Sequence, residues 1–370
     1  MQKLESVQGP FTKIKFEKLN LNSHEQVKSY LLSEGWVPTT YNRVKDKNTG
    51  EWRTTGPKLT EDSFHTIKGE TGQLIARRNV LVHRRRMIEN EKDPEGKGML
   101  SCIRDDGRVP ANGILLGTPT GRTTHRDAVC NVPKAKEKVP YGIEIRRLFQ
   151  ADAQGRRLLG ADLDQIEARV TAHYAAMFDG GEYWRIINET GDIHSYNAKL
   201  IDSDRDTAKS FQYALFYGAG VAKLAAIIGC SAHKAKQHLE NFWQGNKGVY
   251  LLVEELKKQY QHYGFIVGLD GRKFFIRQDY KLLNSLIQGG AGIIWKRWGV
   301  LANQRLVQTC LDCHQVIAYH DEYEYDCDEI EVPLAVPIIK TAALDAGKYY
   351  NLTVPITADV KVGQNWAQVH

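Results

Sequence analysis

The chain has 370 residues and no apolar run of about 20, the length that a helix needs to cross a bilayer. Its first residues, MQKLE, are polar and do not resemble a secretory signal peptide. No internal repeat or low-complexity tract is visible. These absences argue against a membrane protein and a repeat array, and we expect the chain to work in a cytoplasm.

Cysteine is also scarce, with 6 in the chain. Free thiols are the default in a long chain that lacks a secretion signal. Residues 310–314 (CLDCH) match the spacing of a haem-attachment motif, but haem attachment would need export. A zinc site would need a second cysteine pair, and the sequence has none. We therefore interpret this match as chance.

The composition is that of a globular protein, with 42% hydrophobic and 25% charged residues. A chain of this length exceeds one ordinary core, so we expect two or three packed subdomains. The net charge of +6 is compatible with nucleic-acid binding but not diagnostic of it. Arginines crowd residues 77–86, and this pattern fits either a solvated helix face or a phosphate-binding face.

Hydrophobic periodicity predicts an α+β fold. A helix should begin at Ser23, with Gln26 completing a capping box, and end at Gly35. The other predicted elements are strands over 11–19 and 158–161, helices over 72–90, 166–178, 205–217, 231–243, 248–262 and 280–307, and a hairpin over 315–326. We expect a small sheet that draws its strands from distant segments.

Two carboxylates occupy unexpected places. Asp162 ends an apolar strand, and Asp321 lies at the tip of an apolar hairpin. A charge beside buried strands costs several kcal/mol unless something compensates it. Two such groups could share Mg²⁺, which prefers oxygen ligands, and two metals about 3.5–4 Å apart can serve phosphoryl transfer. Each aspartate could equally cap its strand.

A helical stripe raises the odds of phosphate chemistry. Arg205, Lys209, Tyr213 and Tyr217 recur every four residues, and Gly218 follows. Each step of four drifts only about 40° around a helix, so the four side chains share one face. That face is cationic at one end and aromatic at the other, which matches the polarity of a nucleoside triphosphate.

At this point the sequence resembles the polymerase core of family A DNA polymerases. Residues 162–169 (DLDQIEAR), 205–218 and 320–322 (HDE) resemble the three polymerase motifs of that family, in the right order. Residues 35–39 (GWVPT) resemble a thumb segment of phage replicative polymerases, and 365–370 (NWAQVH) resemble a family ending. The resemblance covers nearly the whole chain.

The resemblance implies a right-hand fold with a small antiparallel palm sheet and mostly helical fingers and thumb. It assigns residues 1–105 to the thumb, 106–168 to the first part of the palm, 169–267 to the fingers and 268–370 to the second part of the palm. It also implies the activity, a DNA-directed DNA polymerase that extends a primer 3′ end and releases pyrophosphate.

Functional residues carry over position by position. The resemblance implies that Asp162, Asp321 and the Leu163 carbonyl hold two Mg²⁺ ions, with Glu322 supporting the site. The residues assigned to the incoming deoxynucleoside triphosphate are Arg205, Lys209 and His194 at its phosphates, Tyr213 at its sugar, Glu167 against a 2′-hydroxyl, and Tyr217 with Gly218 near the base. The residues assigned to primer-template DNA are Arg122, Arg272, Asn284, Gln288 and His320.

Two positions depart from the usual family pattern. Asp164 replaces a serine and puts a third carboxylate near the metals, unless it faces away as strand neighbours do. Tyr213 stands where many relatives have phenylalanine, and the family precedent is that tyrosine tolerates a missing 3′-hydroxyl. We therefore expect efficient dideoxynucleotide incorporation.

The resemblance also implies two absences. The thumb-like segment begins almost at Met1, which leaves no room for the 3′–5′ exonuclease domain that family members usually carry. Residues 72–120 look too short for the insertion by which some phage relatives capture thioredoxin, so we do not expect that partner. Proofreading or processivity would need a separate exonuclease or processivity protein. A phage origin and a role in DNA replication are favoured.

Three alternatives stay open from the sequence. A single-subunit RNA polymerase uses similar palm residues, although Glu167 should exclude ribose. A catalytically dead DNA-binding protein would be expected to lose Asp162, Asp321 or Lys209. A two-metal nuclease would not need the stripe over 205–217.

Overall fold

A computed structural model provides the fold. It describes residues 9, 17–46, 49–90, 98–125, 132–137, 139–319 and 321–370. The chain forms two compact units, Met1–Ser101 and Cys102–His370. The predicted strand over 11–19 falls mostly outside the described residues, and residues 17–19 have no regular secondary structure.

The first unit is a small helical body with an exposed hairpin. Its elements are α1 (His24–Ser33), β1 (Tyr41–Lys45), β2 (Trp52–Pro57), the 3-10 helix η1 (Glu61–Thr66) and α2 (Glu70–Ile88). The core of the unit comprises Val27, Leu31, Trp36, Ile67, Ile75 and Ala76. The Ser23 side chain accepts a hydrogen bond from the Gln26 backbone, so the predicted start of the first helix is confirmed. The Gln26 side chain, however, accepts from the Asn20 backbone instead of completing the box.

The arginine cluster of α2 divides between structural and exposed positions. Arg84 is buried and its Nη2 lies 2.8 Å from Glu61 Oε1. Arg78 Nη1 donates to the Leu21 carbonyl at 3.0 Å. Arg77, Arg85 and Arg86 are exposed. Two of the five arginines therefore hold this unit together, and the remaining three face solvent.

The second unit begins with short elements and then becomes mostly helical. The 3-10 helix η2 (Met99–Cys102) contains the last residues of the first unit and the first residue of the second. The elements of the second unit up to the middle of the chain are β3 (Gly113–Ile114), β4 (Thr124–His125), α3 (Gly142–Arg147), β5 (Arg156–Leu163), α4 (Ile166–Asp179), α5 (Glu182–Thr190), α6 (Ile193–Leu200), α7 (Arg205–Phe216), α8 (Val221–Ile228), α9 (Ala232–Gly245) and α10 (Lys247–Tyr263). The elements that follow are β6 (Ile266–Val267), β7 (Lys273–Phe274), η4 (Asp279–Lys281), α11 (Leu282–Gln308), β8 (Cys313–Tyr319), β9 (Glu322–Asp328), α12 (Val332–Tyr349), β10 (Ala358–Gly363) and α13 (Trp366–Val369).

These elements confirm the α+β prediction and most of the predicted boundaries. The helices expected from the periodicity occur within two residues of their predicted ends, as for α7 and α11. The sequence analysis did not predict α5, α6 and α8. These helices are only 8 or 9 residues long, which gives a periodic pattern little room to show.

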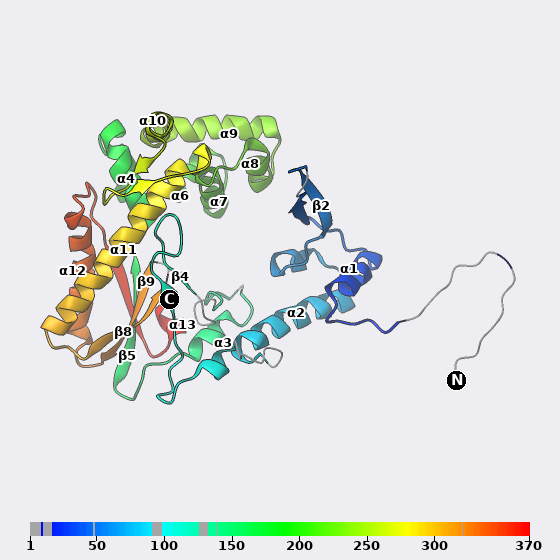
Figure 1. Cartoon of the computed structure of the whole chain (residues 1–370), viewed down its shortest axis with the longest axis horizontal. Coiled ribbons are helices and arrows are strands. Elements are labelled where there is room, and N and C mark those ends of the chain that lie inside the picture. Colours follow the sequence, from blue (N-terminus) through cyan, green and yellow to red (C-terminus); the bar gives the residue numbers. More distant parts are fainter. Residues whose placement is uncertain are drawn as a thin grey trace. The chain divides into compact units, whose positions relative to one another are not determined.

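A four-stranded antiparallel sheet lies in the second unit, in the order β10-β5-β9-β8. Its strands come from three distant parts of the chain, as predicted. The long helix α11 packs against α12 and α4. Figure 1 shows α8, α9 and α10 gathered near one end of α11, and the sheet strands beside its other half.

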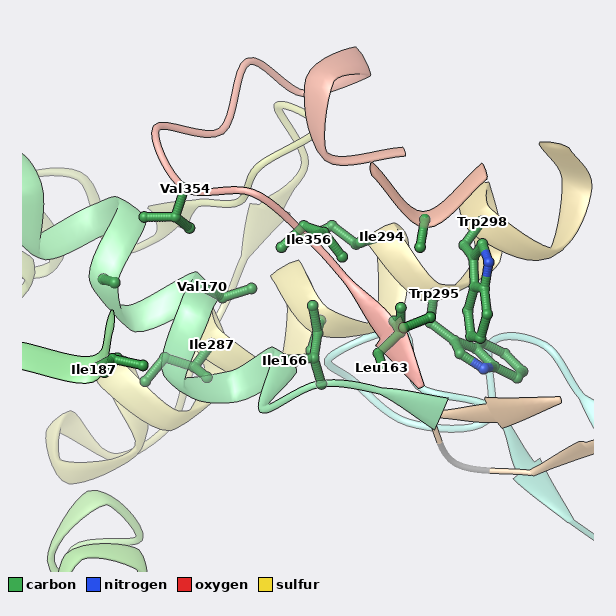
Figure 2. Close-up of a cluster of buried hydrophobic side chains, with 14 of the residues drawn as sticks. Leu163, Ile166, Val170, Ile187, Ile287, Ile294, Trp295, Trp298, Val354 and Ile356 are labelled. Carbon is green, nitrogen blue, oxygen red and sulfur yellow. The ribbon is translucent and has the colours of Figure 1, made fainter. Parts of the chain in front are cut away.

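Alternation along β5 gives the sheet one apolar face. Leu159, Ala161 and Leu163 are buried at 2% exposure or less, and they belong to the large core of this unit. Figure 2 shows Leu163 and Ile166 among side chains of α11, including Trp295 and Trp298. Because neighbours on a strand point to opposite faces, burial of Leu163 turns Asp162 to the other face.

Within the described residues, no helix combines the length and apolar character that a bilayer crossing requires. The described cysteines are free thiols.

Candidate active site

The register of the sheet places the two predicted carboxylates, Asp162 and Asp321, at the same end of the neighbouring strands β5 and β9. This end of the two strands is the carboxylate edge. Asp162 at the end of β5 lies directly opposite Glu322, the first residue of β9. Asp321 precedes Glu322, and its backbone carbonyl accepts a hydrogen bond from Leu163 N at 3.3 Å. Two segments about 160 residues apart therefore meet at this edge, as the sequence predicted.

The electrostatics of this edge favour a bound cation. Burial and the charges of Asp321 and Glu322 raise the pKa of Asp162 to about 7. Asp162 is nonetheless exposed to solvent. Repulsion between carboxylates is what a divalent cation would relieve, and the donors here are hard oxygen atoms.

The donor set is sparse in a way that suits Mg²⁺. In the part of the chain that the structure describes, no three His, Cys, Asp or Glu side chains form a metal cage. Mg²⁺ commonly binds through one or two carboxylates and keeps places for water and substrate phosphates. Two carboxylates, Asp162 and Asp321, together with the Leu163 carbonyl are a donor set that fits this coordination preference.

The third carboxylate of the motif faces elsewhere. Asp164 Oδ2 accepts a hydrogen bond from the Thr357 hydroxyl at 2.6 Å, and Asp164 N donates to the Thr357 carbonyl. The charge of Asp164 also raises the pKa of Asp162, but by less than the charges of Asp321 and Glu322 do. Asp164 is thus tied to the strand edge beside the site.

The face of the sheet that carries Asp162 is acidic and covered. Glu322, Glu324 and Asp326 alternate along β9, and each is at most 5% exposed. Burial and the charge of Glu322 raise the pKa of Glu324 well above its ordinary range. This column of acids was not predicted, although the alternating letters of residues 322–327 (EYEYDC) carry its signal.

Basic groups from distant segments neutralise this acidic face. Arg146 of α3 is fully buried, and the charges of Glu322 and Glu324 oppose the lowering of its pKa by burial. Its guanidinium stacks 4.1 Å from the centre of the Trp366 ring. His370 Nδ1 lies 2.5 Å from Glu322 Oε2, and this contact helps to hold the pKa of Glu322 below its ordinary value despite burial. Sequence reasoning missed these supporting residues.

The predicted stripe lies on the exposed face of α7. Its members are all exposed, whereas Ala208, Phe211, Gln212 and Phe216 of the same helix are buried. Arg205 Nε donates to Asp192 Oδ2 at 2.7 Å. Burial alone would raise the pKa of Asp192, but hydrogen bonds from Arg205 and Ser195 lower it to about 2. Arg205 is therefore already oriented by an anion.

The aromatic end of the stripe reaches the carboxylate edge. Burial raises the pKa of Tyr213 to about 12, and the charges of Glu167 and Asp321 contribute. Arg122 Nη2 lies 2.9 Å from Glu167 Oε1. Gln288 Nε2 donates to the Tyr217 hydroxyl at 2.5 Å. Glu167 of α4 and Tyr213 of α7 thus lie near Asp321, and Gln288 of α11 contacts the neighbouring Tyr217.

Gly218 ends the stripe in a conformation that needs glycine. Its φ is +82°, and a Cβ at this position would lie 2.0 Å from the Tyr280 ring. Any other residue at position 218 would be destabilising, because it would strain the backbone and its Cβ would also clash with Tyr280.

Three other residues were predicted to contact DNA, namely Arg272, Asn284 and His320. Arg272 Nε donates to Asp270 Oδ2 at 2.7 Å. Asn284 is half-buried on α11, one turn before Gln288. His320 lies outside the described residues. The assignments of Arg122, Arg272, Asn284 and Gln288 to DNA all stay predictions, as do the metal and nucleotide assignments.

A family comparison decides the classification. The model of DNA polymerase family A matches residues 1–368. This chain belongs to DNA polymerase family A. The resemblance of the three motifs, inferred from short stretches, is confirmed by this match over the whole length.

The curated relatives include DNA-directed DNA polymerases of phages. The chain is 27% identical to the DNA-directed DNA polymerases of Enterobacteria phage T3 and Escherichia phage T7, over 98% of its own length. It covers 54% of each of these proteins, so it spans about half of their length. It is 25% identical to the DNA-directed DNA polymerase of Escherichia phage Phieco32, over its full length and 73% of that relative.

A solved structure gives the fold of this family A chain independently. The polymerase domain of Pol1 from M. smegmatis, in complex with DNA primer-template and dNTP, aligns with a TM-score of 0.74 at 23% identity. The alignment covers 95% of this chain and 62% of that one. The predicted polymerase fold is confirmed.

Proposed function

We propose that this chain is a DNA-directed DNA polymerase that extends a primer 3′ end by template-directed nucleotidyl transfer. The observation that carries the proposal is that Asp162 and Asp321 meet at one end of the sheet, with Asp321 close enough to Tyr213 of the α7 stripe for its charge to act on that phenol. Membership of family A supports the same reaction. The phage relatives favour phage DNA replication as the biological task.

The metal site follows from the donor set. Asp162, Asp321 and the Leu163 carbonyl would hold two Mg²⁺ ions, whose charge would activate the primer 3′-hydroxyl and stabilise the departing pyrophosphate. Glu322, fixed by His370, would keep the tip of the β8–β9 hairpin in register with β5.

The protein side chains have separate tasks at the nucleotide. Arg205 and Lys209 bind the triphosphate, and Lys209 stabilises charge on the leaving group. Because Asp192 already holds Arg205, a triphosphate would meet a preoriented guanidinium and share it with that carboxylate. Tyr213 packs against the sugar, and Gln288 holds the Tyr217 hydroxyl near the base.

Primer extension tests the function directly. We expect the chain to extend a primed DNA template when Mg²⁺ and the four deoxynucleotides are present. Extension only with ribonucleotides would indicate an RNA polymerase, shortening of the DNA would indicate a nuclease, and binding without either reaction would indicate a DNA-binding protein. The polymerase family model accounts for residues 1–368. We therefore also propose that they do not degrade a mismatched primer 3′ end when deoxynucleotides are omitted.

Replacing Glu167 with alanine should admit ribonucleotides. The Glu167 carboxylate is held beside Tyr213 by Arg122, where it would meet a 2′-hydroxyl. We expect the ratio of ribonucleotide to deoxynucleotide incorporation to rise by about 10²-fold or more. Single-nucleotide insertion kinetics measure this ratio. Glu167→Gln keeps the volume and should retain most of the discrimination, and an unchanged ratio in Glu167→Ala would contradict the assignment.

Tyr213 should allow dideoxynucleotides to be incorporated efficiently. The phenol hydroxyl supplies a polar group where the nucleotide lacks its 3′-hydroxyl. Tyr213→Phe should reduce dideoxynucleotide incorporation by about tenfold to 10²-fold, since one hydrogen bond left unmade costs about 1–3 kcal/mol. Competition between a dideoxynucleotide and its deoxynucleotide measures the change. Strong rejection of dideoxynucleotides by the unaltered chain would refute this role.

A further inference from the structure

A chain of buried amide side chains leads from the end of α9 to His194. Asn246 Nδ2 donates to the Phe242 carbonyl at 2.8 Å and to Asn197 Oδ1 at 2.9 Å. A backbone carbonyl can only accept a hydrogen bond. The orientation of the Asn246 amide is therefore fixed, and Asn197 Oδ1 must be an acceptor.

Each amide whose orientation is fixed also fixes the orientation of the next amide in this chain. Asn197 is completely buried, and its Nδ2 donates to Gln212 Oε1 at 2.9 Å. Gln212 is 5% exposed, and its Nε2 donates to the Tyr183 hydroxyl at 3.3 Å. Gln212 Oε1 is consequently the acceptor at the end of the chain.

This acceptor determines which nitrogen of His194 carries a hydrogen. His194 Nδ1 lies 3.0 Å from Gln212 Oε1, so Nδ1 must be protonated. A neutral imidazole has only one N–H. The neutral His194 therefore has a bare Nε2, which would repel a phosphate oxygen. Only the cationic imidazolium can keep the bond to Gln212 and also donate from Nε2.

We propose that binding of a nucleoside triphosphate adds a proton to His194, and that Gln212, Asn197 and Asn246 are positioning residues that enforce this requirement. The inference rests on the proposed function, because it takes the triphosphate to be the ligand of α7. It deepens that function by making the affinity for nucleotide dependent on pH.

The surroundings of His194 set the proton affinity before nucleotide binds. Burial lowers the pKa of His194, and the charges of Lys209 and Arg205 of α7 lower it further. The charge of Asp192, the N-cap of α6, and the hydrogen bond with Gln212 raise it. The Tyr213 ring of α7 lies 5.9 Å from the imidazole. The net effect is a pKa below the ordinary value, which favours the neutral imidazole before nucleotide binds. A polyphosphate beside it would raise that pKa.

The sign of the pH dependence follows. Nucleotide affinity is fully present below the pKa of His194 in the free protein. It is lost as the pH rises through the higher pKa in the complex. Between the two values the affinity falls by up to about tenfold per pH unit, since one proton enters with each nucleotide.

Calorimetry of a non-reacting complex measures the proton directly. The chain would be bound to a primer-template whose primer ends in a dideoxynucleotide, and the matching deoxynucleotide would be added with Mg²⁺. Repeating the titration in two buffers with different ionisation enthalpies gives the number of protons taken up. His194→Gln is the matched control, because the glutamine retains a donor but cannot gain a proton. We expect uptake of up to about one proton at neutral pH in the unaltered chain beyond that of the control.

A buried-chain variant tests the positioning residues. Gln212→Met removes the acceptor, so Nε2 can carry the hydrogen of a neutral ring, and proton uptake should disappear although His194 remains. Gln212→Glu keeps the acceptor and adds a charge, so His194 should already be protonated and uptake should also fall. Imidazole ¹⁵N chemical shifts of the unaltered protein report the tautomer without any variant, should Gln212→Met not fold.

The outcomes separate the two proposals. Equal proton uptake by the unaltered chain and His194→Gln, or ¹⁵N shifts that place the hydrogen on Nε2 of the free protein, overturns this inference alone. A chain that binds no matching nucleotide overturns the proposed function as well.

Discussion

Replacing Asp321 with alanine should reduce primer extension by at least about 10³-fold while leaving the affinity for primer-template nearly unchanged. The hairpin tip holds one of the two carboxylates that would bind cations, and such charge stabilisation is worth several kcal/mol in the transition state at about 1.4 kcal/mol per tenfold. Duplex binding depends on other, positively charged surfaces. Single-turnover extension measures the rate, and fluorescence anisotropy of labelled primer-template measures the binding.

The matched control is an aspartate at the other end of the same hairpin. Asp328 ends β9, and its carboxylate accepts a hydrogen bond from Ile330 N at 2.9 Å. Asp328→Ala removes an equal charge from the strand without touching the proposed metal site, and its extension rate should stay within a few-fold of the unaltered chain. Normal extension by Asp321→Ala would end the metal assignment.

Replacing Lys209 with methionine should lower the maximal extension rate by about 10²-fold to 10³-fold, which is the usual effect of deleting one group that stabilises developing charge. Lys209 is exposed on α7, near His194 and 6.0 Å from the centre of the Tyr213 ring. Methionine keeps the length and apolar stem of the side chain. Pre-steady-state insertion at saturating nucleotide separates the rate from the nucleotide affinity.

Two further variants sharpen this test. Lys209→Arg keeps the charge and should recover part of the rate. Lys223→Met removes an exposed lysine of α8, outside the stripe, and should leave the rate unchanged. A Lys209→Met enzyme that differs only in nucleotide affinity would show that the lysine binds the ground state without acting on the leaving group.

The stripe of α7 was predictable from the sequence because its information is local. A spacing of four places Arg205, Lys209 and Tyr213 on one face of any helix, and Phe211 and Phe216 supply the opposite, buried face. The aspartates were predictable for a similar reason, since Asp162 follows an apolar run and Asp321 lies at the tip of an apolar hairpin. The meeting of β5 with β9 followed from the family resemblance more than from either strand.

The supports of the site were not predictable, because each depends on partners far away in the chain. Arg146 lies in a short helix and neutralises acids of β9. The neighbouring sequence gives no indication that this arginine is fully buried. Asn197 and Gln212 are polar residues within helices, and Asn246 lies between α9 and α10; a pattern places such residues at the surface, yet all three are at most 5% exposed. Their roles come from one another, and only the folded arrangement reveals them.

The position of β10 in the sheet has a consequence for biosynthesis. β5, which presents Asp162, is flanked by β9 on one side and by β10 on the other, and both partners are made much later than β5 itself. During synthesis β5 therefore leaves the ribosome before either partner strand, with the backbone hydrogen-bonding groups on both of its sides unpaired. Such unpaired strands can pair with other nascent chains. Polysomes that crowd many copies of this chain should thus depend on chaperones until residues 358–363 emerge and close the second edge.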